Sequence, residues 1–175
     1  MYCKTIFSIL CLLLISINVQ CQVVQTVPLN SIDLTNGTYY KDIENELSFW
    51  VGTWEGTADN KKYTFTFILL GNNFFSFPNG DYYYKDIVVG KLKVTDLITN
   101  QVIYDESSFA SYDDYIIKGN TIYGREFYFG FYDKESHCNN RADFTLVRYE
   151  DNPNQIRYKD FSYGEYFTLD DPCPY

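Results

Sequence analysis

Residues 50–69, WVGTWEGTADNKKYTFTFIL, predict a β-hairpin whose pattern recurs along the rest of the chain. From residue 50 to residue 58, side chains of two kinds alternate, as they do on the two faces of a strand. One face contains Trp50, Gly52, Trp54, Gly56 and Ala58, and the other contains Thr53, Glu55 and Thr57. Asp59-Asn60 is typical of a turn, and aromatic residues alternate with threonines in residues 63–67. We therefore expect two antiparallel strands with the tryptophan face directed into the core.

The remainder of the chain alternates between short strands and turns. Further strands are predicted at Phe74–Phe77, Tyr82–Thr95, Gln101–Tyr104, Tyr112–Lys118, Thr121–Asp133, Ala142–Tyr149, Gln155–Phe161 and Glu165–Leu169. Turns are expected at residues 78–81, 119–120 and 151–154. Consecutive hairpins without helical crossovers favour an all-β, antiparallel up-and-down meander of roughly eight to ten strands, which best avoids exposed edges by closing into a barrel.

Two N-terminal segments depart from the strand pattern. Residues 22–38 contain proline, asparagine and glycine without any period, which indicates an extended N-terminal arm. In residues 39–50, Ile43, Leu47 and Trp50 recur at helical spacing among charged residues, which predicts one short amphipathic helix. Residues 39–175 are then expected to form a single domain.

The first 21 residues have the layout of a secretory signal peptide. A single cation, Lys4, precedes an apolar run at residues 6–17 and a short polar stretch that ends at Cys21. We expect cleavage after Cys21 and a protein that is exported, either to a periplasm or to the medium. The alternative is an N-terminus anchored through a lipidated Cys21. No other segment approaches the roughly 20 apolar residues of a membrane-spanning helix, so no membrane span is expected.

The composition of the chain limits its partners. Aromatic residues make up 19% of the chain, and tyrosine and phenylalanine favour pleated sheet. The formal charge of −9 becomes −10 when Lys4 is removed with the signal peptide. A chain this acidic has no basic surface for nucleic acid or for anionic lipid, so neither is expected as a partner.

Beyond residue 21 the chain has two cysteines, Cys138 and Cys173. An even number of cysteines in an oxidising compartment favours a disulfide bond between them. Two unpaired thiols are the alternative.

The stretch Val51-Gly52-Thr53-Trp54 resembles the start of a lipocalin, in which a short helical turn leads into a strand marked by Gly-x-Trp. The resemblance implies a lipocalin-like barrel, with Gly52 and Trp54 as structural residues and an arginine packed against the tryptophan. Arg148 is the candidate, because it shares strand parity with Phe144 and Leu146, whereas Arg157 is expected to face water. Alternatively, Arg148 is a surface charge at a strand end.

The whole chain also resembles a family of small exported bacterial proteins without an assigned activity. The residues that show this resemblance are Val51 to Gly56 and the run Phe77-Pro78-Asn79-Gly80-Asp81-Tyr82-Tyr83-Tyr84.

The common catalytic constellations are missing from the sequence. His137 is the only histidine, and there is no Gly-x-Ser-x-Gly elbow, so a nucleophilic triad and a zinc site both lack residues. No glycine-rich phosphate loop is present, so we expect no cofactor. Because a zinc site lacks ligands, we expect no metal either. Paired carboxylates for glycoside hydrolysis cannot be located from one sequence.

Three functions from different classes follow. The first is a non-enzymatic binding protein that holds a small apolar or amphipathic ligand in the barrel, against aromatic side chains at Trp54, Phe65, Phe67, Phe127 and Phe129. The second is an interaction protein, such as an inhibitor or accessory subunit, that uses exposed tyrosines around Asp81 to Asp86. An enzyme with two carboxylates ranks third. An interior cavity would favour the first function, and a filled interior the second.

Overall fold

A computed structural model describes residues 24–32, 35–106, 111–132 and 141–164. Its ten strands belong to one sheet, and the only helical elements in these ranges are two 3-10 turns, η2 (Ser48–Trp50) and η3 (Tyr112–Asp114). The strands are β1 (Thr26–Pro28), β2 (Tyr39–Lys41), β3 (Gly52–Ala58), β4 (Lys61–Ser76), β5 (Tyr82–Asp96), β6 (Val102–Asp105), β7 (Ile117–Tyr123), β8 (Glu126–Tyr132), β9 (Arg141–Arg148) and β10 (Ile156–Gly164). The prediction of a mostly β protein is confirmed.

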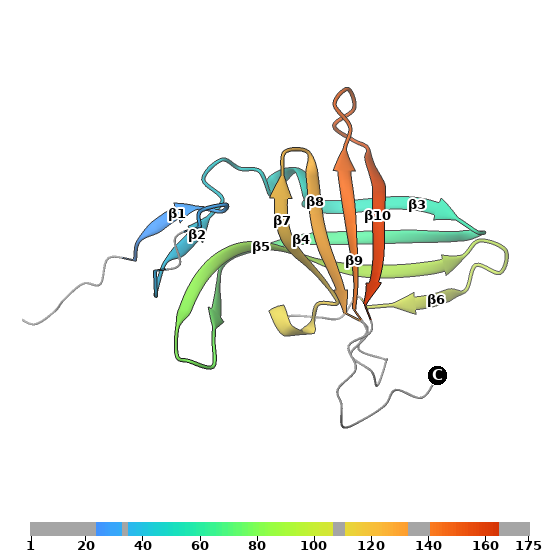
Figure 1. The fold of residues 1–175 in the computed structure, drawn as a ribbon. Coiled ribbons are helices and arrows are strands. Elements are labelled where there is room, and N and C mark those ends of the chain that lie inside the picture. The colour runs from blue at the N-terminus through green and yellow to red at the C-terminus, as the bar shows by residue number, and fades with distance from the viewer. Residues whose placement is uncertain (1–23, 33–34, 107–110, 133–140, 165–175) are drawn as a thin grey trace, which may run out of the picture.

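The long hairpin of β4 and β5 is the centre of the sheet. β3 pairs with the outer edge of β4, and the free edge of β5 is shared by β2, β7 and β6 in turn. β7, β8, β9 and β10 then continue as antiparallel neighbours. In Figure 1 these four strands cross β3, β4 and β5 at a steep angle, so the sheet folds over on itself.

The predicted closure into a barrel is wrong. β3 pairs only with β4, and β10 pairs only with β9, so in the described part of the chain these two strands leave their outer edges unpaired. The two halves of the sheet are joined by a short pairing of β5 with β7, at Val89–Lys118 and Gly90–Ile117. β2 and β6 pair with other parts of that edge of β5, so β7 does not continue along β5 as a neighbouring strand of a closed barrel would.

The N-terminal segments also differ from the prediction. Part of the expected arm forms β1, which pairs in parallel with β2, and β2 pairs in parallel with β5, so the sheet is mixed and not wholly antiparallel. The helix predicted at residues 39–50 is absent. The Asp42 carboxylate instead accepts hydrogen bonds from the backbone N–H groups of Glu46 and Leu47, at 2.8 and 2.9 Å, and Asn45 has a φ of 58°. Such side-chain bonds to the backbone compete with helix formation.

Asp86 of β5 fastens this N-terminal segment to the sheet. Its carboxylate is buried and accepts hydrogen bonds from the Tyr39 hydroxyl at 2.6 Å, the Asp42 N–H at 2.9 Å and the Asn72 N–H at 2.8 Å. Asn72 lies where the register of β4 against β5 shifts, so one carboxylate satisfies donors from the N-terminal segment and from β4.

Two details of the predicted turns need correction. Residues 74–76 are not a separate strand but continue β4 beyond that shift. The turn expected at Gly119-Asn120 is a β-bulge within β7, and the chain reverses instead at Gly124, where φ is 61°. Gly119 is required there for packing, because a Cβ at this position would lie 2.5 Å from the Phe127 ring.

The core lies between the two crossing halves of the sheet. Phe67 of β4 stacks on Phe129 of β8, with ring centroids 4.9 Å apart, and Phe129 stacks on Phe144 of β9 at 5.3 Å. Trp50 of η2 is 1% exposed and packs edge-on against Phe127 at 5.3 Å. Deleting a buried Phe or Trp side chain lowers the free energy of unfolding by about 3–5 kcal/mol, so each large ring of this cluster contributes several kcal/mol to stability.

Several expectations fall outside the described residues. These are the signal peptide with Cys21, the strand at 165–169, His137, and the proposed Cys138–Cys173 disulfide. Within the described ranges, no helix has the length and apolar character needed to cross a bilayer.

Candidate functional site

The aromatic residues expected to line an interior site are packed mainly against one another. Phe67, Phe127 and Phe129 are at most 2% exposed, and the centroids of Phe127 and Phe129 are 4.2 Å apart. Phe65 and Trp54 are half-buried at the margin of the same cluster. The hollow that reaches Phe127 has a volume of about 20 Å³, enough for about one water molecule. Side chains therefore fill this part of the interior.

The Gly-x-Trp strand is arranged differently from the expected one. Trp54 donates its indole N–H to the Trp50 carbonyl at 2.9 Å and lies 5.6 Å from the Phe49 ring. Gly52 is exposed, with a φ of 129°. The Arg148 guanidinium lies over Phe49, 5.5 Å from its centroid, so Phe49 takes the place that the lipocalin resemblance gives to Trp54.

The tyrosines of residues 82–84 are half-buried. Tyr83 stacks on Phe75 at 4.9 Å, while Tyr82 and Tyr84 lie against Phe74 at 5.8 and 5.5 Å. Each of the three tyrosine rings is therefore partly covered by a neighbouring phenylalanine.

The outer face of β7–β10, turned away from the core, contains a polar row. Thr121, Tyr128, Thr145 and Asp160 are aligned as cross-strand partners on four neighbouring strands. A β-bulge lies beside each end of this row: one leaves Asn120 without a partner in β7, and the other leaves Lys159 without a partner in β10. A bulge bends its strand and redirects the adjoining side chains, and bulges are enriched next to functional sites.

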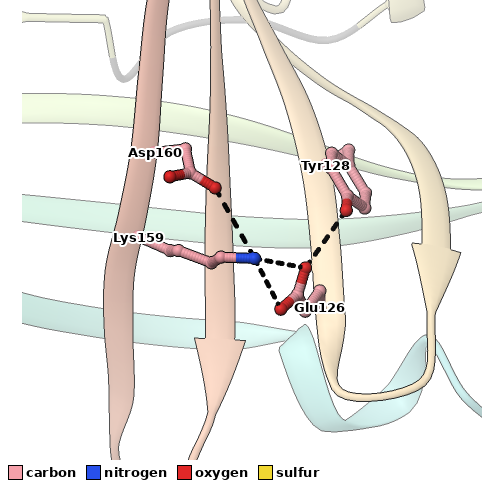
Figure 2. A network of polar contacts seen from close by, with 4 residues as sticks. All are labelled: Glu126, Tyr128, Lys159 and Asp160. Carbon is pink, nitrogen blue, oxygen red and sulfur yellow. Dashed lines mark hydrogen bonds and ion pairs between the residues drawn. The ribbon is translucent and has the colours of Figure 1, made fainter.

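Lys159 joins β10 to β8 across this row, as Figure 2 shows. It extends from β10 across β9 and donates to both oxygens of Glu126 on β8, at 2.8 and 3.0 Å. Its ammonium also lies 3.6 Å from Asp160 Oδ2, which is ion-pair distance. The Tyr128 hydroxyl donates to Glu126 Oε2 at 3.1 Å, and this bond restrains the tyrosine ring on the face.

Ionisation of these groups follows from their contacts. The hydrogen bond from Lys159 holds the pKa of Glu126 below its ordinary value, and the same bond raises the pKa of Lys159. The hydrogen bond to Glu126 raises the pKa of Tyr128, because it stabilises the neutral phenol. At neutral pH the network therefore contains a carboxylate, an ammonium and a neutral tyrosine.

Two hollows lie on either side of Tyr128, which lines both of them. One, of about 420 Å³, is lined by Arg141, Asp143, Thr145 and Asp160 among others. The other, of about 680 Å³, extends over Glu126 and Arg157 to the β9–β10 turn. Both are far larger than the hollow that reaches Phe127, and both have many hydrogen-bonding groups.

Sequence reasoning missed this face. Strand alternation places Lys159 in water beside Arg157, but it assigns Asp160 to the opposite face, and only the bulge brings Lys159 and Asp160 together. The available signal was weaker: Thr145 and Ser162 are small residues on strands otherwise rich in large ones. Both line the hollow that Tyr128 and Arg141 also line.

Among the described residues, no three His, Cys, Asp or Glu side chains gather in a way that could hold a metal ion.

Neither the curated proteins nor the solved structures contain a match to this chain. The model of one family, described as a family of unknown function (DUF6705), matches residues 3–163. Since the match covers most of the 175 residues, the chain belongs to this family of unknown function.

Proposed function

We propose that the protein is an exported, non-catalytic binding protein that takes its ligand on the outer face of β8, β9 and β10. The single observation that supports this site is the pair of hollows that share Tyr128, in a molecule whose interior aromatics are packed together. The proposal of export rests on the signal-like residues 1–21.

Binding is favoured over catalysis by the state of the carboxylates. A glycosidase needs one carboxylic acid whose pKa is raised so that it can donate a proton at neutral pH. On this face the pKa of Glu126 is lowered by Lys159, and Asp143 accepts from Arg141 at 2.8 Å. These contacts keep Glu126 ionised and place a cation, Arg141, beside Asp143.

The two other binding sites considered have less support. A small apolar ligand inside the sheet would have to displace rings such as Phe67 and Phe129, which are in contact. A protein partner at the tyrosines of residues 82–84 would meet rings that already pack on Phe74 and Phe75.

Chemical-shift mapping tests the location of the site. Isotope-labelled protein is titrated separately with laurate, inorganic phosphate and a maltose hexasaccharide, and the backbone amides are followed by heteronuclear NMR. We expect at least one probe to shift amides around Tyr128, Thr145 and Asp160. Shifts confined to the amides of Phe67 and Phe129 would locate the binding site in the interior. If no probe shifts an amide on the outer face, the proposal is refuted.

A further inference from the structure

We infer that the ligand of this outer face is a neutral oligosaccharide, one ring of which stacks on Tyr128 while its hydroxyl groups bond to the paired charges on either side. This inference rests on the proposed function and adds the chemical class of the ligand. Three observations support it: a restrained exposed aromatic ring, a balanced set of charges, and hollows on both sides of the ring.

Tyr128 is suited to stacking because it is both accessible and held in place. It is 40% exposed, and its hydroxyl is fixed to Glu126. The face of an aromatic ring is apolar and carries partial negative charge, which matches the C–H groups on one side of a sugar ring. Since the tyrosine is restrained before the ligand arrives, little side-chain entropy is lost on binding.

The charges of the face are equal in number, and most of them are in ion pairs: Arg125 with Glu150, Arg141 with Asp143, and Lys159 with Glu126 and Asp160. Five cations line or border the two hollows, namely Arg125, Arg141, Arg148, Arg157 and Lys159, and an equal number of Asp and Glu carboxylates lie among them. The whole chain, in contrast, has a formal charge of −9. A charged ligand would gain from one sign and lose to the other, and it would have to compete with existing ion pairs. A neutral ligand escapes both costs.

The same pairs retain capacity for hydroxyl groups. Arg141 donates from Nε and Nη2 to a single oxygen of Asp143, Oδ1, at 3.0 and 2.8 Å. At 3.6 Å, the distance from Lys159 Nζ to Asp160 Oδ2 exceeds that of a hydrogen bond. Carboxylate oxygens with lone pairs beyond those that these cations occupy can accept from sugar hydroxyls, and the Arg157 guanidinium in the larger hollow can donate to them. Each hydroxyl both donates and accepts, so a surface that alternates the two roles suits a polyol.

The placement of the hollows sets the length of the ligand. Because Tyr128 lies between hollows of about 420 and 680 Å³, a chain stacked on it can extend in both directions. We therefore expect affinity to increase from a monosaccharide to an oligosaccharide, as contacts in both hollows are added.

Isothermal titration calorimetry tests the ligand class. Neutral hexasaccharides of glucan, chitin and xylan type are compared with glucose and with a galacturonate hexasaccharide, which is polyanionic. We expect at least one neutral hexasaccharide to bind, more tightly than glucose and more tightly than the polyanion. Substitution Tyr128→Ala should reduce its affinity about tenfold or more, through loss of stacking. Tyr128→Phe, which keeps the ring, should stay within about threefold of the wild type.

Phe74→Ala is the matched control, because Phe74 is 54% exposed but lies on β4, outside both hollows. It should leave the affinity unchanged. An affinity that Tyr128→Ala does not alter would overturn the inference. If no neutral saccharide binds but phosphate, laurate or galacturonate shifts the amides around Tyr128, the ligand class is wrong while the proposed binding face stands. If no probe affects these amides, both fail.

Discussion

Removing the Asp86 carboxylate should destabilise the protein far more than removing an exposed one. Asp86 is 6% exposed and accepts three hydrogen bonds, two of them from backbone N–H groups that lose this acceptor when the side chain is shortened. Hydrogen bonds to charged groups contribute about 1.5–3 kcal/mol each, and an unsatisfied buried donor costs about 1–3 kcal/mol. Since the Tyr39 hydroxyl can turn to water, we expect Asp86→Ala to lower the free energy of unfolding by about 4 kcal/mol.

The amide variant separates charge from shape. In Asp86→Asn, one oxygen can still serve Tyr39 and Asn72, which both donate to Oδ1, but an NH₂ group would face the Asp42 N–H. One bond is lost, and we expect a cost of about 2 kcal/mol. Urea unfolding measures both values, with exposed Glu44→Gln as a control expected within about 0.5 kcal/mol of the wild type. An Asp86→Asn protein as stable as this control would show that the carboxylate does not hold the N-terminal segment.

Two further predictions concern packing and pH. Gly119→Ala should lower the free energy of unfolding in urea by about 1–3 kcal/mol, because the new Cβ would lie 2.5 Å from Phe127. Gly56→Ala, whose Cβ would have no atom within 4 Å, should lower it less. Equal losses of stability in the two variants would contradict the packing argument. Burial, followed by the hydrogen bond to Asp86, raises the pKa of Tyr39 to about 12, and burial near other tyrosines raises that of Tyr112 to about 12. Because both folded pKa values exceed the ordinary 10, their stabilising contribution is complete below pH 10 and is lost as the pH rises from 10 to 12. Phenolate absorbance and urea midpoints followed across this range should show late-titrating tyrosines and a falling midpoint, and a midpoint independent of pH would refute the assignment.

The strands could be predicted because their signal is local. In β3 and β4, glycines, tryptophans and phenylalanines alternate with threonines, and the two strands pair as expected, with Trp54 opposite Phe65. The helix prediction failed because the spacing of Ile43, Leu47 and Trp50 says nothing of the Asp42 side chain, which captures the backbone N–H groups that a helix would need.

The candidate site could not be predicted because its geometry is not local. Thr121 and Asp160 belong to the same row only through the registers of three strand pairs. Two bulges, at Asn120 and Lys159, shift those registers, and neither has a sequence signature that distinguishes it from regular strand or turn. In the described part of the chain, the unpaired outer edges of β3 and β10 have the same origin, since they depend on how one edge of β5 is divided among three partners.

The outer edge of β10 is unpaired in the described part of the chain, and this affects how copies of the protein associate. An outermost strand with a straight row of unpaired N–H and C=O groups is a template on which a second chain can add, and natural proteins interrupt such rows with bulges and lysines. β10 has both at one position, because its bulge residue is Lys159. The residue whose bulge brings Asp160 into the polar row therefore also interrupts the edge of β10 as a template for aggregation, and we expect a variant that straightens this strand to lose solubility.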